Sequence, residues 1–505
     1  MPNRARLSAL LLTSAALVAA CGGGGGGGGP GAGSPPPAPV PNPPSPPPAT
    51  SISFANASVH DPSIIKVGTE YYVFGSHLAA AKSTDLMNWT LIADRVDDAN
   101  PLFTNVLTAL QPTFAWSQVN DLWAPDVVKL GDGKFYFYYD SCRGDSPLSA
   151  MGVAVADTVT GPYTNEQIFL KSGMNGLSED GVSNYDAHVH PNVVDPQVFF
   201  DVAGKLWMIY GSYSGGIFIL EMDGTTGLPK PGQGYGRHLL GGDHARIEGA
   251  YVIHNPQTGF YYMFVSFGGL DANGGYNIRV SRSQAPDGPY FDGAGTDMST
   301  VRGNPTVLFD DSRIAPYGQK LLGNYQFANT VGETGTPTGY VSPGHNSAYF
   351  DAGLGKYFLI FHTRFPGRGE QHEIRVHEFF FNSDGWPVVA PFRYAPLSLA
   401  NPAQAAEVTA ADVAGTYKMI DHGKDISATI KSSQAIQLGA NGTVSGAATG
   451  TWTHRGNNLV DLSLAGTVYS GVLSRQWNPN ANAFVVTFTV QSQTGVSLWA
   501  ARTGD

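Results

Sequence analysis

Residues 248–267 read EGAYVIHNPQTGFYYMFVSF, and this stretch decides the fold. A polar residue leads into an apolar run, a turn containing glycine follows, and a second run rich in aromatic residues ends the unit. Two such runs separated by turn residues predict a β-hairpin. Because both runs are apolar along most of their length, we expect both faces of each strand to be buried.

The same unit occurs five times between residues 60 and 364. Several copies are followed by a further strand and turn, as in MGVAVADTVTGPY at 151 and NIRVSRSQAPDGPY at 277. Four strands in each of five repeats predict sheets arranged radially, which is a five-bladed β-propeller. An array of β-sandwiches is the alternative that the pattern leaves open. The other four copies are HDPSIIKVGTEYYVFGSH from His60, APDVVKLGDGKFYFYYDS from Ala124, VDPQVFFDVAGKLWMIYGSY from Val194 and GHNSAYFDAGLGKYFLIFHTR from Gly344.

The composition supports an all-β protein and excludes some partners. Only 14% of residues are charged, whereas 63 glycines and 35 prolines provide many turns. With 29 basic and 40 acidic residues the net charge is −11, and no basic cluster follows the first few residues. A polyanion would be repelled, so we expect no nucleic-acid partner.

The N-terminus predicts export. Arg4 and Arg6 precede an apolar stretch, and Ala19 and Ala20 stand directly before Cys21, which is similar to a bacterial lipoprotein signal. Residues 1–21 are then a signal peptide ending at the lipidated cysteine, and 22–50 a Gly/Pro-rich tether. We expect a protein lipid-anchored at the outer membrane or cell surface, or secreted if the signal is an ordinary secretory peptide. The membrane is contacted only through this anchor.

The rest of the chain divides into two predicted domains. Residues 51–398 form the propeller, and 399–505 form a C-terminal domain whose strands alternate apolar and polar residues, as in a small antiparallel β-barrel. The tail carries no carboxylate pair, so we expect it to support the propeller or to add a polysaccharide contact. Cys142 is the only other cysteine, so no disulfide framework is expected.

In a propeller the innermost strands begin beside one axis, so the residues heading the five hairpins should converge. A carboxylate before proline, as at Asp61 and Asp195, often only caps a turn, and Asp126, which follows proline in WAPD, looks most like a structural cap. The glutamate has apolar cover from Ile247 and Gly249–Ala250, which favours the protonated form that a general acid needs. The five residues are Asp61, Asp126, Asp195, Glu248 and His345.

The ordered set HDPS at 60, WAPD at 123, VDP at 194, IEGAY at 247 and GHNS at 344 resembles glycoside hydrolase family 43, more narrowly its bacterial endo-1,5-α-L-arabinanases. The resemblance covers residues 52–396, and the tail resembles the lipocalin-like barrel attached to longer members. It implies an inverting hydrolase that cuts internal α-1,5 bonds of arabinan. An exo-acting arabinosidase or β-xylosidase of the family, and a non-catalytic carbohydrate-binding lipoprotein, remain alternatives.

The resemblance also implies roles for single residues. Asp61 would be the general base, Glu248 the general acid, and Asp195 the residue that tunes the acid and orients the sugar. His345 would hold one calcium ion in the central channel, although a histidine bonded within the core is the alternative. We expect a monomer whose partners are arabinan and its oligosaccharides. Besides Asp61, the implied sugar-binding residues are Trp123 as a stacking face, Gly144, Asn192, Ser212 and Ser214.

Overall fold

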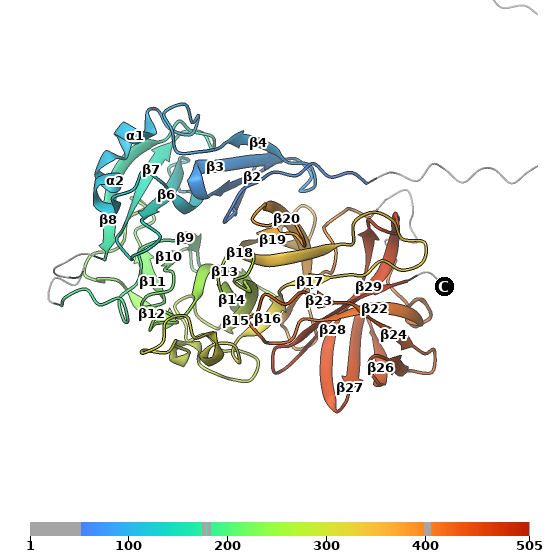
Figure 1. The fold of residues 1–505 in the computed structure, drawn as a ribbon. Coiled ribbons are helices and arrows are strands. Elements are labelled where there is room, and N and C mark those ends of the chain that lie inside the picture. Colours follow the sequence, from blue (N-terminus) through green and yellow to red (C-terminus); the bar gives the residue numbers. More distant parts are fainter. Residues whose placement is uncertain (1–51, 174–177, 179–182, 398–405, 504–505) are drawn as a thin grey trace, which may run out of the picture. The chain divides into compact units, whose positions relative to one another are not determined.

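The computed structural model describes residues 52–173, 178, 183–397 and 406–503. Within this part, five sets of four antiparallel strands follow one another along the chain (Figure 1); four sets are separate four-stranded sheets, and the fifth is part of a six-stranded sheet. The strands of the first two sheets are β1 (Ser63–Val67), β2 (Glu70–Gly75), β3 (Ala79–Ser83), β4 (Thr90–Ala93), β5 (Trp123–Lys129), β6 (Phe135–Cys142), β7 (Ser149–Ala156) and β8 (Thr164–Ser172). The third and fourth sheets comprise β9 (Gln197–Phe200), β10 (Leu206–Tyr210), β11 (Ile217–Met222), β12 (Arg237–Leu240), β13 (Ile247–Asn255), β14 (Phe260–Phe267), β15 (Asn277–Ser283) and β16 (Gln319–Leu322). The fifth comprises β18 (Gly339–Asp351), β19 (Lys356–Arg364), β20 (Glu373–Phe381) and β21 (Pro387–Val389).

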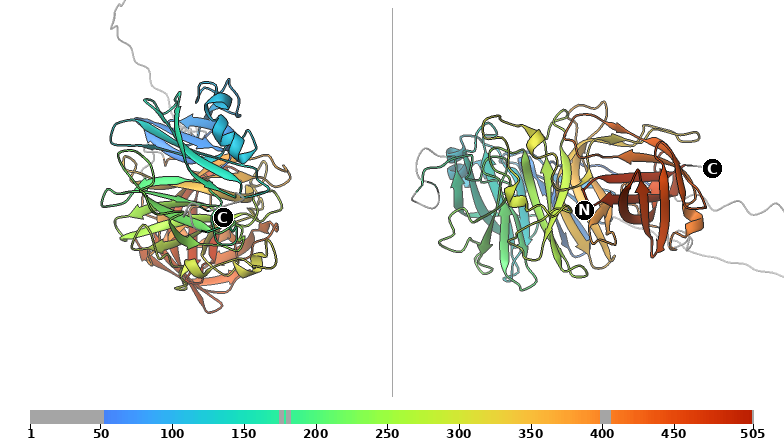
Figure 2. Two further views of the ribbon diagram at one scale, coloured as in Figure 1. Left: turned by 90° about the vertical axis from the view of Figure 1, so that its left-hand side faces the viewer. Right: turned by 90° about the horizontal axis from the view of Figure 1, so that it is seen from below.

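The sheets close into a ring. Innermost strands contact their neighbours in the order β1, β5, β9, β13, β18, and β18 returns to β1. The five-bladed propeller predicted from the repeat is therefore confirmed, and the array of sandwiches is excluded. Figure 2 shows the blades from two further sides.

Glycine makes the hairpin turn in each blade. The residue at the turn between the two innermost strands has a positive φ, between 62° and 85°, which only glycine adopts without strain. This is the physical basis of the repeat, because each turn sets the register of the two apolar strands that flank it. The five glycines are Gly68, Gly133, Gly204, Gly259 and Gly355.

Apolar side chains fill the spaces between blades, as strands that are apolar on both faces require. Buried apolar clusters lie between each pair of neighbouring blades, and the cluster between blades five and one closes the ring. Short helices lie in the connections between strands. They are η1 (Ser76–Leu78), α1 (Val106–Ala109), α2 (Gln111–Ser117), η2 (Met298–Thr300) and η3 (Asp311–Arg313), with α4 (Ala410–Val413) before the barrel. Among the described residues, no helix has both the length and the apolar character needed to cross a membrane.

The C-terminal domain is a closed barrel of eight antiparallel strands in the described residues, as predicted. Its interior is a separate apolar core. The predicted boundary at 398/399, the signal peptide and the tether lie outside the described residues. The barrel strands are β22 (Gly415–Asp421), β24 (Gln434–Leu438), β25 (Thr443–Gly446), β26 (Gly450–Gly456), β27 (Leu459–Leu464), β28 (Thr467–Asn478), β29 (Ala483–Ser492) and β30 (Ser497–Arg502).

The barrel also joins the fifth blade directly, which the sequence did not indicate. Strand β17 (Tyr325–Gln326) pairs with the start of β18, and β23 (Lys431–Ser432) from the barrel region pairs in parallel with β17. Buried Ile420 and Trp499 of the barrel belong to the same apolar cluster as blades four and five. The two predicted domains therefore share a core.

Candidate active site

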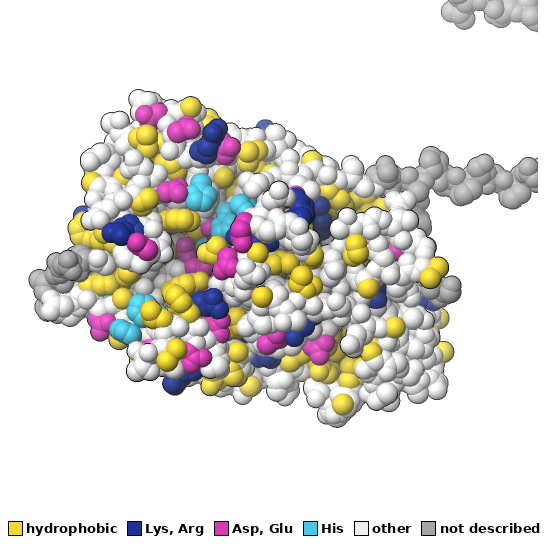
Figure 3. Space-filling view, viewed as in Figure 1, with side chains coloured by type: hydrophobic (Ala, Val, Ile, Leu, Met, Phe, Trp, Pro, Cys, Tyr) yellow, Lys and Arg dark blue, Asp and Glu magenta, His cyan; other side chains and the backbone are white. Residues whose placement is uncertain are grey.

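One dipeptide from each blade lines the central channel. They are Asp61–Pro62, Ala124–Pro125, Asp195–Pro196, Gly249–Ala250 and His345–Asn346. Four of these blades enter the inner strand with a positive φ, at Asp61 (53°), Asp195 (59°), Gly249 (63°) and His345 (42°). A non-glycine residue is strained there, so the ring of contacts must hold these residues in place. Figure 3 shows acidic and histidine side chains around a recess in this face.

The prediction that all five hairpin-heading residues line this channel is wrong for Asp126. This residue lies two positions after Ala124, within β5. Its Oδ1 accepts from the Ser63 hydroxyl and its Oδ2 from the backbone N–H of Val198, 2.7 Å away. These bonds tie three blades together, as expected of a cap. Burial raises the pKa of Asp126 to about 6, against the bonds from Ser63 and Val198.

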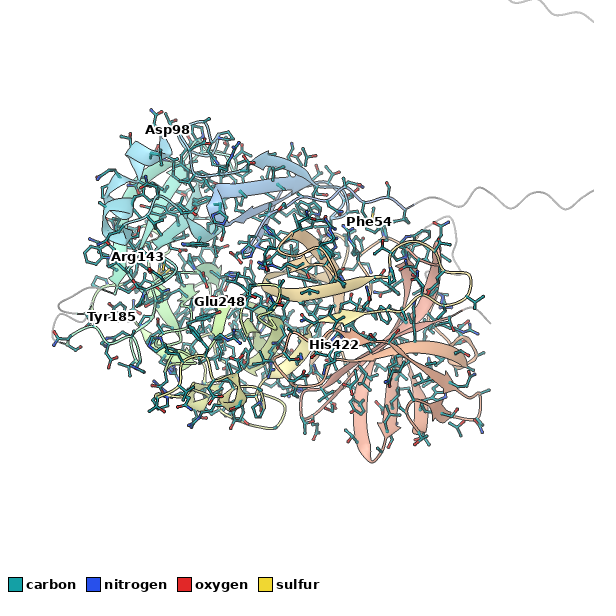
Figure 4. All side chains as sticks on the ribbon, viewed as in Figure 1. Phe54, Asp98, Arg143, Tyr185, Glu248 and His422 are labelled. Atoms are coloured by element: carbon teal, nitrogen blue, oxygen red, sulfur yellow. The ribbon has the colours of Figure 1, made fainter. Side chains whose placement is uncertain are left out.

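Glu248 also differs from the prediction, because Gly249 takes the channel position in its blade. A β-bulge between Glu248 and Tyr251 shifts the register of β13 against β14. The Ser212 hydroxyl donates to Oε2 at 2.6 Å, and the Tyr276 hydroxyl donates to Oε1 at 2.8 Å. Both carboxyl oxygens are thereby oriented, and Figure 4 shows Glu248 near the centre of the propeller.

Asp61 is surrounded by imidazoles. Nδ1 of His60 lies 2.7 Å from Oδ2, while Nδ1 of His345 and of His362 lie 3.2 and 3.4 Å from Oδ1. The Ser76 hydroxyl donates to Oδ2 as well. Burial alone would raise the pKa of Asp61, but the charges of His60, His345 and His362 and the bond with His60 together hold it well below its ordinary value. The carboxylate is therefore ionised and can accept a proton.

Asp195 has a carboxyl neighbour that sequence reasoning missed. The N–H of Asp195 donates to Oδ2 of Asp140 at 3.3 Å. Oδ1 of Asp140 and Oδ2 of Asp195 are buried and have no hydrogen-bond partner among the described residues. Burial, followed by the negative charges of Glu248, Asp140 and Asp61, raises the pKa of Asp195 well above its ordinary value, and burial does the same for Asp140. Asp140 lies within β6, the second strand of blade two, where no sequence signal separates it from its strand neighbours.

Three of the predicted sugar-binding residues meet at Cys142. Its carbonyl accepts from Nε1 of Trp123 at 2.7 Å, and its Sγ accepts from the N–H of Gly144 at 3.4 Å. Sγ also lies 3.9 Å from Oδ1 of Asn192. Asn192 in turn forms a β-bridge with Ser212, whose hydroxyl is bonded to Glu248.

For Ser214, the remaining predicted sugar-binding residue, the structure gives a backbone contact. Ser214 is buried, and its carbonyl accepts from the N–H of His244 at 3.0 Å. Ser212 is closer to the chemistry than predicted, since its hydroxyl is bonded to Glu248.

The channel offers donors that fit a hard cation. His345 lines it, and Ser266 Oγ accepts the N–H of His345 at 2.7 Å, which fixes the backbone. Neighbouring Asn346 also lines the channel, and its side-chain oxygen and nitrogen are buried without a partner among the described residues. A buried carboxamide oxygen is a ligand type that calcium prefers. The residues present therefore fit such an ion.

Another set of ligand atoms, from His60, Asp61 and His362, lies within 4.8 Å of one another. Nδ1 of His362 already accepts the N–H of Asp61 at 3.2 Å. We therefore interpret the two histidines of this set as partners of the Asp61 carboxylate rather than as metal ligands.

Comparison with known proteins agrees with this arrangement. Residues 52–311 match the model of glycosyl hydrolases family 43, and 391–500 match a C-terminal lipocalin-like domain. The chain is 59% identical to extracellular endo-α-(1→5)-L-arabinanase 2 of Bacillus subtilis, over 89% of this chain and 94% of the relative. This chain belongs to glycosyl hydrolase family 43.

Another relative in the family has a known structure. The extracellular endo-α-(1→5)-L-arabinanase of Thermotoga petrophila is 46% identical over 89% of this chain and 94% of the relative. Its crystal structure superposes with a TM-score of 0.84, covering 90% of this chain and 100% of that one. The match to this family 43 enzyme includes the barrel as well as the propeller.

Proposed function

We propose that this family 43 protein is an endo-α-1,5-L-arabinanase that cuts internal bonds of arabinan. The observation that carries the proposal is the proximity of three carboxyl groups from three blades, since the negative charges of Glu248 and Asp61 both act on Asp195. Two relatives that match almost the whole chain carry this activity in their names. No feature of the described residues favours another reaction.

Asp61 is the general base in this mechanism. Its ionised carboxylate takes a proton from a water molecule, and the water oxygen attacks the anomeric carbon from the face opposite the leaving group. The three imidazoles keep the carboxylate charged and oriented, so it is ready to act at neutral pH.

Glu248 is the general acid, and it gives its proton to the glycosidic oxygen as the bond breaks. Ser212 and Tyr276 hold its carboxyl group in one orientation. Asp195 lies beside both groups and orients the sugar in the gap between them. After one turnover Asp61 carries the proton and Glu248 has lost one, and exchange with water restores both. Attack from the opposite face inverts the anomeric configuration.

Calcium belongs to the proposal as a resident ion held by His345, with the Asn346 oxygen and water as further ligands. When bound, the ion supplies positive charge that stabilises negative charge developing near the axis. His345 itself acts on Asp61, because its ring lies against Oδ1. Trp123, Gly144, Asn192, Ser212 and Ser214 are proposed to contact the sugar chain.

Export is supported by the word extracellular in the names of both relatives. We further propose that Cys21 carries a lipid anchor and that the enzyme acts as a monomer. A Cys21→Ser variant is expected to appear in the medium rather than in the membrane fraction, and light scattering on the purified enzyme is expected to give one chain.

The test is hydrolysis of linear α-1,5-arabinan by wild type and by Asp61→Ala, Asp195→Ala and Glu248→Ala. Wild type is expected to release a spread of oligosaccharides early, and the variants to be strongly impaired. Early release of only short units would indicate exo action, and binding without turnover would indicate a carbohydrate-binding protein. Unimpaired variants would refute the site.

A further inference from the structure

A loop beside the acid exposes three consecutive apolar side chains. Val307, Leu308 and Phe309 are 53, 62 and 52% exposed. The loop is held by its own bonds, since Nδ2 of Asn304 donates to Asp310 at 3.0 Å. Exposed apolar side chains gathered in one place commonly mark a binding surface.

Phe309 stands out within this loop. Its φ is 59°, in the left-handed region that a bulky residue avoids. Backbone strain of this kind concentrates at functional sites, where the surrounding structure enforces it. Here the following residues enforce it, because Asp311 is paired with Arg246, with Nε 3.0 Å from Oδ1.

Phe309 is linked to Glu248, the proposed general acid, through contacts made by Tyr213 and Ser212. Its ring centroid lies 5.8 Å from that of Tyr213 at an edge-on angle of 64°, and the Arg246 guanidinium lies 6.0 Å from the ring. Tyr213 follows Ser212, whose hydroxyl donates to Glu248. The N–H of Tyr213 also donates to the carbonyl of Ile247, next to the acid, at 3.0 Å.

We propose that Phe309 is a stacking platform for an arabinofuranosyl unit on the leaving-group side of the bond that is cut. The proposal rests on the function proposed above. Glu248 donates its proton to the oxygen that stays with the leaving saccharide, so residues beside Glu248 face that saccharide. An aromatic face offers a sugar ring a broad apolar contact at little conformational cost.

The position of the platform has a consequence for where the chain is cut. Phe309 contacts Tyr213, the residue after Ser212, and it is Ser212 that is bonded to Glu248, so the sugar that stacks on Phe309 is beyond the unit next to the cut. Such a site is filled only when the substrate continues past the cut on this side. Phe309 therefore favours cuts that leave at least two sugar units on the leaving-group side of the bond.

A simpler explanation is that Phe309 only supports Tyr213 and Arg246. Substrate length separates the two explanations. A supporting residue acts through Glu248, so its loss impairs short and long substrates equally. A platform contributes only when a sugar reaches it, so its loss is felt on long substrates alone.

The experiment compares Phe309→Ala with wild type on arabinobiose, which is too short to reach the platform, and on arabinohexaose and linear arabinan. The platform predicts a KM for arabinohexaose that is raised about three- to tenfold with kcat retained, as for the loss of one aromatic contact, and unchanged kinetics on arabinobiose. Phe309→Trp is expected to keep the wild-type KM, and Phe309→Leu is expected to raise KM as Phe309→Ala does. Phe350→Ala is the matched control, because Phe350 is 43% exposed and packs on Tyr357 at 4.5 Å, and it is expected to behave as wild type.

The outcomes separate the two proposals. A Phe309→Ala variant with wild-type kinetics on all substrates, or with equal losses on short and long ones, overturns the platform while the arabinanase function stands. A wild-type enzyme that does not cut arabinan at all overturns the function on which the platform rests.

Discussion

Nδ1 of His345 lies 3.2 Å from Oδ1 of Asp61, so the channel histidine and the proposed base touch across the seam where the fifth blade meets the first. The same seam is closed by an apolar cluster and by Lys66, whose Nζ lies 2.6 Å from Oδ2 of Asp351. The base is therefore positioned by closure of the ring as well as by its own strand. A change at His345 is therefore expected to alter the position and the pKa of the Asp61 carboxylate.

Removal of calcium is expected to lower kcat, because the proposed ion lies against the histidine that orients Asp61. Dialysis against a chelator followed by assay on arabinan checks this, and added calcium is expected to restore activity. A His345→Ala variant is expected to be impaired whether or not calcium is added. Full activity after complete chelation, verified by elemental analysis, would contradict the calcium proposal.

Substitution of the base itself is expected to remove most of the activity. Asp61→Asn keeps the shape of the side chain but cannot accept the proton, so kcat is expected to fall by about 10²- to 10⁴-fold. Reducing-sugar release measures the loss, and an unchanged melting temperature shows that the fold is intact. A variant that retains more than a tenth of the activity speaks against Asp61 as the base.

Asp140 gives a prediction about a residue outside the expected set. Burial raises the pKa of Asp140 well above its ordinary value, which favours the neutral form of the carboxyl group that accepts the N–H of Asp195. Asp140→Asn preserves a neutral acceptor and is expected to stay within about twofold of wild type. Asp140→Ala removes the acceptor, and misplacement of Asp195 is expected to cost about 10- to 100-fold in kcat. Equal damage in both variants would show that the negative charge of Asp140 is needed.

Asp126 is expected to make stability depend on pH. Its pKa is about 6 in the folded chain against an ordinary 3.8, so the folded state binds the proton more tightly than the unfolded state. Its stabilisation is complete below pH 3.8 and is lost as pH rises through 6, a change of about 3 kcal/mol in the free energy of unfolding. Urea unfolding between pH 3.5 and 7 measures it.

The matched variant is Asp126→Asn, which does not titrate. The variant is expected to lose less stability over this range than wild type, because it lacks the titration of Asp126. The titration of Asp140 and Asp195, whose pKa values are also raised, contributes equally in both proteins. Parallel curves for the two proteins would contradict the role assigned to burial of Asp126.

The barrel is expected to support the propeller near the acid. A Cβ on Gly275, which has a φ of 71°, would come within 2.6 Å of the backbone nitrogen of Ser427 in the barrel region. Gly275 directly precedes Tyr276, the partner of Glu248. Gly275→Ala is therefore expected to lower the free energy of unfolding by about 1–3 kcal/mol and to reduce kcat, as melting and arabinan assays would show. Gly259→Ala, at an open turn with nothing within 4 Å, is the control for backbone strain alone.

Local signals made the propeller predictable. Each blade repeats a glycine turn between apolar strands, and this pattern depends only on neighbouring residues. The channel positions of Asp61, Asp195 and His345 followed from the start of each repeat. The tail barrel followed from alternation of apolar and polar residues.

Features that depend on contacts between blades were not predictable. The bulge at Glu248 places Gly249 in the channel, and nothing in IEGAY reveals a register shift against β14. Asp140 reads as part of an apolar strand and meets Asp195 only because blades two and three pack together. The two-residue strand β23 is too short to carry a pattern, so the joint between barrel and propeller was missed.

The central claim is that Asp61 and Glu248 cut one sugar bond in a single displacement by water. The most direct measurement is proton NMR of the first products from linear α-1,5-arabinan, recorded before mutarotation equilibrates them. The mechanism predicts that the β-anomer appears first at the new reducing end. An α-anomer appearing first would mean retention through a covalent intermediate, and the roles given to the two carboxyl groups would be wrong.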